Sequence, residues 1–125
     1  MIENEIATKV INILIKIHRK LGPGLLESVY EEVICYELRK NGISYHRQKN
    51  INVIYEDAKL DIGFRCDIIV ENKVIIEIKS VEYIAPVHPK ILLTYLRLTE
   101  LRLGLLANFN VALMKDGITR VVNNL

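Results

Sequence analysis

The chain lacks the features by which several classes of protein are recognised. It has two cysteines among 125 residues, Cys35 and Cys66, and neither lies in a Cys/His spacing that would bind zinc. We therefore expect both to be small, buried, reduced side chains. No apolar run approaches the length of a membrane span, and the acidic start Met1–Glu5 lacks the basic segment of a signal peptide. These absences predict a cytoplasmic protein with no membrane partner.

Charge of one sign is also scarce, because the net charge is only +2. Composition alone therefore does not indicate nucleic-acid binding, although a basic face remains open beside the alternative of an ordinary solvated surface. The basic residues concerned are Arg19, Lys20, Arg39, Lys40, Arg47, Lys49, Arg97 and Arg102. The chain has no repeats or linkers, and 50% of its residues are hydrophobic, which predicts one domain over residues 1–125 with a core that needs no disulfides.

Apolar spacing predicts three helices, over about Glu5–Leu21, Leu25–Asn41 and His88–Leu101. Gly22-Pro23-Gly24 separates the first two, and Gly42 follows the second. Alternating and continuous apolar runs predict five strands. They are expected at Ile51–Tyr55, Phe64–Val70, Val74–Lys79, Leu103–Phe109 and Ile118–Val122, with turns at residues 56–59, 71–73 and 115–117. The order of elements is then ααβββαββ.

Charged residues interrupt two of these strands. Asp67 lies within one strand, and Glu77 and Lys79 lie within the next. A three-residue turn would pair Val70 with Val74 and place Asp67 opposite Glu77. Two such carboxylates repel unless a cation lies between them, and oxygen ligands favour Mg²⁺ or Mn²⁺. The pattern predicts a metal-dependent hydrolytic site, with Lys79 positioned to hold water or to counter charge on a phosphate.

Two alternatives remain open for this cluster. A two-residue turn at Asn72-Lys73 would shift the register by one residue and remove Asp67 from the face of Glu77. A buried ion pair between Lys79 and one carboxylate would leave the other carboxylate unexplained.

Strand alternation predicts which neighbours share a face with Asp67. Arg65 and Ile69 are expected on its face, with Phe64, Cys66, Ile68 and Val70 on the other. Arg65 could then bind phosphate at the rim, or be an ordinary surface residue.

The helices supply three further candidates. Glu27 lies at the margin of an apolar helical stripe, although an acid in the first turn also favours a helix N-terminus. Tyr30 could orient Glu27, or pack in the core with a bonded hydroxyl. His88 could contact a phosphate or the attacking water, or it could simply start a helix before Pro89.

Several segments resemble the GxxExxY proteins. The signature occurs as Gly24-Leu25-Leu26-Glu27-Ser28-Val29-Tyr30, and similar segments follow in order over nearly the whole chain. These are Phe64–Asp67, Ile76–Lys79, Pro86–His88, Leu103–Phe109 and Lys115–Ile118. The family is placed in the PD-(D/E)xK nuclease superfamily, so the resemblance implies a restriction-endonuclease-like α/β (α+β) fold with a central mixed sheet flanked by helices.

The resemblance also implies a catalytic set of Glu27, Asp67, Glu77 and Lys79. The metal would be held by the three carboxylates and the backbone carbonyl of Ile78.

In related nucleases a helix after this motif often carries Q-x-x-x-Y, which helps to shape the site. Tyr95 occupies the tyrosine position here, but Ile91 replaces the glutamine. That departure removes a polar side chain near the metal.

Two functions therefore remain open. One is a Mg²⁺-dependent phosphodiesterase acting on nucleic acid, with DNA favoured over RNA. The other is a catalytically inactive nucleic-acid-binding or regulatory module on a nuclease scaffold, which Ile91 and the near-neutral charge favour. A homodimer is compatible with both functions.

Overall fold

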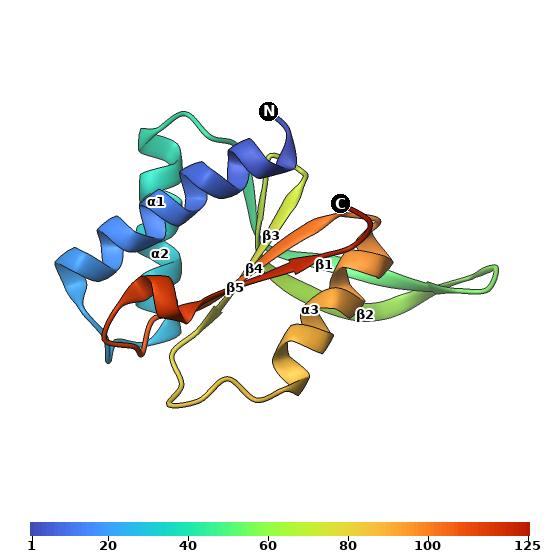
Figure 1. Cartoon of the computed structure of the whole chain (residues 1–125). Helices are drawn as coiled ribbons and strands as arrows, with labels where there is room; N and C mark the ends of the chain where they lie inside the picture. The colour runs from blue at the N-terminus through green and yellow to red at the C-terminus, as the bar shows by residue number, and fades with distance from the viewer.

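A five-stranded sheet lies at the centre of the structure, which is a computed structural model describing residues 1–125 (Figure 1). Its strands follow chain order: β1 (Tyr45–Tyr55), β2 (Ala58–Val70), β3 (Val74–Lys79), β4 (Leu103–Asn108) and β5 (Ile118–Val122). Strands β3 and β4 are parallel, and the other neighbours are antiparallel. The sheet is therefore mixed.

Helices cover both faces of this sheet (Figure 1). Helices α1 (Glu3–Leu21) and α2 (Glu27–Lys40) lie on one face, over the larger core of 21 buried residues. Helix α3 (Val87–Thr99) joins the two parallel strands and covers a smaller core on the other face. The order ααβββαββ predicted from the sequence is confirmed. No helix combines the length and the apolar character needed to cross a bilayer.

Glycine and left-handed residues end the helices near the predicted places. Gly22, with φ 74°, follows α1, and Gly42, with φ 68°, comes two residues after α2. Helix α2 begins at Glu27, two residues later than predicted. Helix α3 ends at Thr99 because Glu100 is left-handed, with φ 60°.

Strands β1 and β2 are longer than the sequence predicts. The two strands pair with each other from Tyr45 opposite Val70 to Tyr55 opposite Ala58. Their polar residues therefore also belong to the ladder. The predicted turn over residues 56–59 is shorter, because Ala58 and Lys59 belong to β2.

The connection after β4 also differs in detail. A 3₁₀ helix, η1 (Met114–Gly117), occupies the predicted turn, and β5 pairs antiparallel with β4.

The hairpin of β2 and β3 has the predicted register. Val70 pairs with Val74 and Ile68 with Ile76, across a three-residue turn. The alternative two-residue turn is not formed.

Side-chain alternation along β2 is broken, contrary to the prediction. Ile68 and Val70 pack in the larger core, whereas Cys66 packs with Ile69 in the smaller core under α3. Because its neighbour Cys66 faces α3, Arg65 does not share a face with Ile69. The predicted grouping of Cys66 with Ile68 is therefore wrong.

The break lies at Asp67, which the ladder places opposite Gln48 of β1. This pair is missing between the pairs Arg47–Ile68 and Lys49–Cys66, and Gln48 has φ 52°. A left-handed residue redirects the side chains that follow it, so the two strands change phase together.

Candidate functional site

Asp67 and Glu77 meet where β2 and β3 separate. Backbone pairing between the two strands ends at Ile68 and Ile76. Beyond that point a Glu77 carboxylate oxygen accepts the Asp67 N–H at 3.0 Å, and an Asp67 carboxylate oxygen accepts the Ile78 N–H at 2.8 Å. The two side chains thus replace the next steps of the ladder. The structure brings the two acids together as the register predicts.

Neither carboxylate has the electrostatics of an ordinary surface acid. Burial, with the adjacent Asp67 charge, raises the pKa of Glu77 to about 8. Burial also raises the pKa of Asp67; the Ile78 N–H opposes that rise, and the Glu31 charge adds to it. Two like charges in a partly buried place favour either a proton on one of them or a cation between them.

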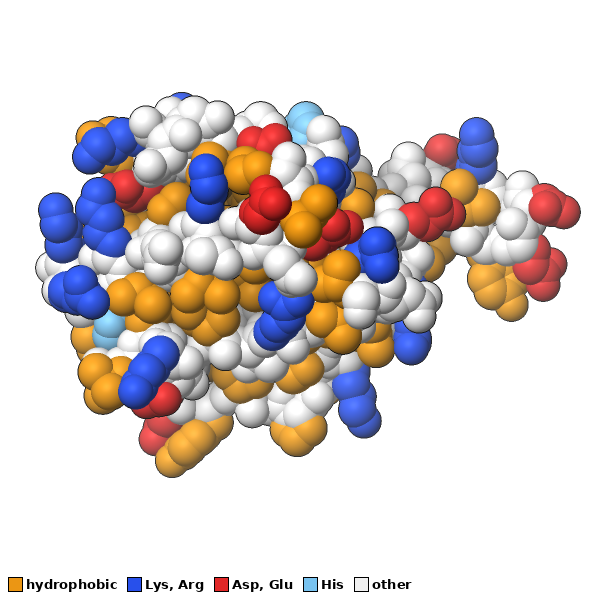
Figure 2. Space-filling model, turned by 45° about the horizontal axis from the view of Figure 1, so that its top comes forward, with side chains coloured by type: hydrophobic (Ala, Val, Ile, Leu, Met, Phe, Trp, Pro, Cys, Tyr) orange, Lys and Arg blue, Asp and Glu red, His pale blue; other side chains and the backbone are white.

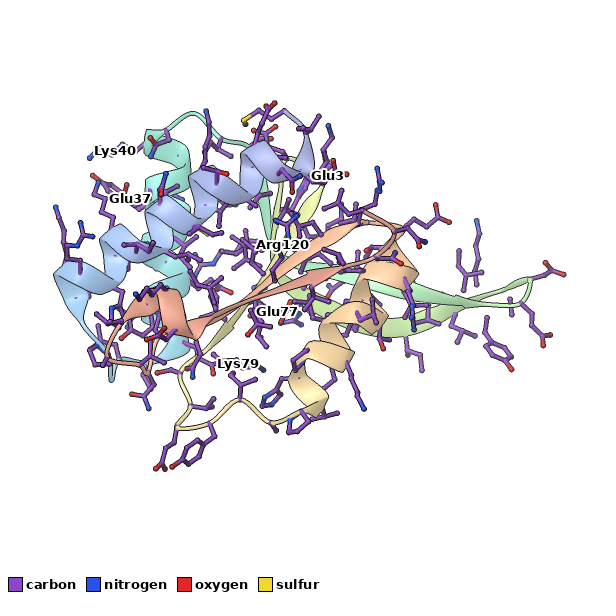
Figure 3. The ribbon with its side chains drawn as sticks, in the orientation of Figure 1. Glu3, Glu37, Lys40, Glu77, Lys79 and Arg120 are labelled. Atoms are coloured by element: carbon purple, nitrogen blue, oxygen red, sulfur yellow. The ribbon has the colours of Figure 1, made fainter.

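Lys79 lies half-buried at the end of β3 and forms no ion pair. The chain's three ion pairs are Lys16–Glu37, Arg47–Glu31 and Arg47–Glu32. The alternative of a structural pair between Lys79 and a carboxylate is therefore not formed. Figure 3 shows Glu77 and Lys79 near the end of β3, in the region bounded by the sheet, by α3 and by the segment that connects β3 to α3.

Glu27 reaches the end of β3 from the first turn of α2. One of its carboxylate oxygens accepts the Ser80 N–H at 3.2 Å, and the Ser80 hydroxyl donates to the Leu25 carbonyl at 2.8 Å. An open cavity of about 600 Å³ adjoins this contact and is lined by Glu27, Ser80 and Asn110, among others. Glu27 is thus held against Ser80, the residue that follows Lys79 after the end of β3.

Tyr30 packs in the core and makes no hydrogen bond to Glu27. Its ring stacks on Phe109 with the ring centroids 4.1 Å apart. Its hydroxyl donates to the Gly22 carbonyl at 2.6 Å and accepts the Leu25 N–H at 3.2 Å. Of its two predicted roles, the structure has the packed side chain with a bonded hydroxyl. Through these two bonds Tyr30 fixes the loop from which α2 starts.

His88 closes the start of α3. Its Nδ1 accepts the Ala85 N–H at 3.1 Å, while its own backbone N–H donates to the Ala85 carbonyl at 3.0 Å. This reciprocal pair resembles a capping box and matches the helix-start alternative. The other ring nitrogen of His88, Nε2, has no hydrogen-bonding partner within the chain.

Tyr95 lies farther along α3 at the edge of the site. It stacks on Phe64 with the ring centroids 4.3 Å apart, and burial, with the Glu77 charge, raises the pKa of its hydroxyl. Ile91 lies one turn earlier on the same side of the helix and is 40% exposed. Arg65 lies outside this group: it is exposed, and its Nε donates to the Asn50 side chain at 3.1 Å.

Glu31 and Gln48 are site neighbours that the sequence analysis missed. Glu31 is 7% exposed and accepts from Arg47 Nε at 2.8 Å and from the Gln48 amide. The same Gln48 nitrogen lies 3.5 Å from Asp67 Oδ1, so it connects the two acids. The position of Glu31, one helical turn after Glu27, is a signal the sequence offers. Gln48 has no such signal, because its role depends on the break in alternation.

Asn108 is a third missed residue, hidden in an apolar run. It is buried beside Lys79 in the parallel ladder. Its side chain accepts the N–H groups of Val81 and Asn110 at 3.1 and 3.2 Å, and donates to the Val81 carbonyl at 3.0 Å. It therefore fixes the chain directly after Lys79.

The donor set suits a hard divalent cation. Asp67 and Glu77 supply carboxylate oxygens, and the Ile78 carbonyl points to the same side as the N–H that Asp67 accepts. A cation there would remove the repulsion that contributes to the raised pKa of Glu77. No three His, Cys, Asp or Glu side chains converge closely enough to hold an ion by themselves. The side chains of this set are therefore the two carboxylates, with the Ile78 carbonyl as a further oxygen on the same side.

One family model matches nearly the whole chain. The model of a family described as the PD-(D/E)XK nuclease superfamily matches residues 4–121. The mixed sheet flanked by helices is consistent with the restriction-endonuclease-like fold. Searches among curated proteins and among solved structures give no match.

Proposed function

Because the chain belongs to the PD-(D/E)XK nuclease superfamily, we propose that it is a divalent-metal-dependent phosphodiesterase that hydrolyses nucleic acid, with DNA as the preferred substrate. The observation that carries the proposal is the pair of partly buried carboxylates at the point where β2 and β3 separate, beside a lysine that has no ionic partner. A merely structural cluster would use that lysine to neutralise one of the acids.

Asp67, Glu77 and the carbonyl of Ile78 would hold Mg²⁺ or Mn²⁺, with Glu27 as the third acid close by. The bound cation would polarise the scissile phosphate and lower the pKa of a nearby water. The Asp67 and Glu77 oxygens that now accept backbone N–H groups fix both side chains in place. Pre-positioned carboxylates need little rearrangement before they can bind an ion.

Lys79 would act on the reacting atoms. Its ammonium group is free to hold the attacking water and to stabilise the charge that develops on the phosphate. Asn108 and the Glu27–Ser80 contact hold the backbone at Ser80 and Val81, directly after Lys79. This limits the positions that the Lys79 side chain can reach. His88 is a candidate for a substrate phosphate, and Tyr30 and Tyr95 support the site through packing.

A second candidate function rests on Ile91. Its apolar side chain is 40% exposed and lies on the same face of α3 as Tyr95. Related nucleases often have glutamine at the position of Ile91. This favours an inactive nucleic-acid-binding or regulatory module. Such a module would bind DNA in a salt-dependent way without metal, and would not cleave it.

The test is cleavage of single- and double-stranded DNA and RNA in Mg²⁺ or Mn²⁺ by the wild type and by Lys79→Ala. We expect the variant to lose about 10³-fold in rate with unchanged circular dichroism and thermal unfolding. Lys40→Ala is the matched control, because Lys40 is exposed at the far end of α2 (Figure 3). Cleavage by Lys79→Ala at the wild-type rate would refute the assignment. Metal-independent binding with no cleavage of any substrate would favour the module.

A further inference from the structure

Strands β1 and β2 extend beyond the body of the protein as a two-stranded ribbon, here called the arm (residues 51–64). Figure 1 shows it projecting away from the helices. A glycine is required where the two strands of the arm approach closely, because a Cβ at Gly63 would lie 1.8 Å from the Ile51 carbonyl oxygen. Its ladder shifts register between Asn52 and Ile54 and continues to Tyr55 and Ala58.

One face of the arm is apolar along its whole length. Pairing of Ile51 with Phe64 and of Tyr55 with Ala58, together with strand alternation, places one set of side chains on a single face. The set is Ile51, Val53, Tyr55, Ala58, Leu60, Ile62 and Phe64. The opposite face carries Asn52, Lys59 and Asp61, with Ile54 as its one large apolar residue. Such alternation is typical of a ribbon with one face buried.

The structure leaves most of this apolar face uncovered. Helix α3 covers only its base, where Tyr95 stacks on Phe64. Farther out, Ile62 is 74% exposed and Tyr55 is 66% exposed. A two-stranded ribbon alone is at best marginally stable in water, and a contiguous apolar patch indicates an interaction surface.

Charges at the two ends of this face indicate what covers it. Lys49 is exposed at the base, on the α3 face, because it pairs with Cys66 of the smaller core. The turn at the tip carries Glu56 and Asp57. Figure 2 shows acidic side chains at the far end of the arm and hydrophobic ones beside them. The apolar stripe is thus bounded by a cation at one end and by anions at the other.

We propose that two copies of this chain dimerise through the apolar faces of their arms, packed face to face and antiparallel. About seven residues separate the base from the tip, roughly 23 Å, and this span is the same in both copies. A two-fold axis would therefore place the acidic turn of each copy beside Lys49 of the other copy, so that the contact occurs twice. The two ribbons would form a small sandwich about 10 Å thick. The proposal is independent of the nuclease assignment.

The first experiment measures mass in solution by light scattering and sedimentation over a range of concentrations. We expect wild type to be a dimer, and Ile62→Glu to be a monomer with unchanged circular dichroism. Ile54→Glu is the matched control, because Ile54 is 58% exposed on the opposite face of the same arm. It should remain a dimer. A monomeric wild type at hundreds of micromolar would overturn the proposal, as would equal effects of the two substitutions.

The second experiment tests the antiparallel arrangement by exchanging charges. Lys49→Glu, and separately Glu56→Lys with Asp57→Lys, should each weaken dimerisation by at least about tenfold through like-charge repulsion. Combining all three substitutions should restore dimerisation. Failure of the combined variant to dimerise more strongly than either partial one would show that the tip does not meet the base of a second copy.

Discussion

At the scale of single residues, the central feature is that Asp67 and Glu77 each bond to the backbone of the opposite strand. The sequence could predict that these acids are neighbours, because the three-residue turn fixes the register. It could not predict the bonds, since they depend on the ladder stopping at Ile68 and Ile76. It also could not predict Gln48, whose link to Asp67 arises from a left-handed backbone inside a strand.

The raised pKa of Glu77 makes stability depend on pH. In the unfolded chain Glu77 loses its proton near pH 4.5, whereas in the folded chain it keeps that proton to about pH 8. Over this window the folded state binds more protons, so the free energy of unfolding falls as pH rises, by at most about 1.4 kcal/mol per pH unit. Denaturant titrations from pH 4.5 to 8 check this. Glu77→Gln should flatten the curve; an equally steep curve in that variant would assign the slope to other groups.

Replacing Ile91 by glutamine should raise cleavage activity. The amide would lie one helical turn before Tyr95 and restore a hydrogen-bonding group beside the site. A hydrogen bond worth about 1 kcal/mol in the transition state corresponds to about fivefold in rate. Steady-state cleavage rates test this, with Leu98→Gln, also exposed and nearly two turns farther along α3, as the control. Equal rates for Ile91→Gln and wild type would show that the glutamine position is not needed here.

At the scale of elements, α2 is tied to β1 by one arginine and two glutamates of unequal burial. Arg47 pairs with both, but the Glu31 side chain is only 9% exposed whereas that of Glu32 is 60% exposed. Glu31→Gln should lower the free energy of unfolding by about 1–3 kcal/mol, because a buried partner is lost. Glu32→Gln should change it by less than about 1 kcal/mol. Urea unfolding of the two variants measures the difference, and equal losses would contradict this ranking.

Element boundaries show which physical signals a sequence carries. Periodicity predicted α1 and β3 well because their apolar faces are strongly marked. It shortened β1 because residues 45–50 are largely polar, and it missed the alternation of Ala58, Leu60 and Ile62 at the start of β2. Residues 45–50 become strand by pairing with residues 65–70, and the start of β2 pairs with the end of β1. The sequence prediction also assumed that side chains alternate without a break through Asp67. In the structure the alternation breaks there, opposite Gln48.

At the scale of the whole molecule, the sheet and its two helical layers converge on one edge. The N-terminus of α2 meets the end of β3 there, where Glu27 contacts Ser80, the residue after Lys79. The arm continues from the Asp67 side of β2, where β2 and β3 separate, and projects away from α1 and α2 (Figure 1). The order of elements predicted this layout, but the uncovered face of the arm emerged only from the register of β1 and β2.

The most direct measurement is calorimetric titration of Mn²⁺, and then Mg²⁺, into wild type and Asp67→Asn at pH 8. Metal binding does not depend on finding the right nucleic acid, so it tests the carboxylate pair itself. The account predicts saturable binding by the wild type and loss of at least about tenfold in affinity in Asp67→Asn, with both proteins folded by circular dichroism. No binding by the wild type, or equal binding by both proteins, would contradict the assignment of Asp67 and Glu77 as a metal site.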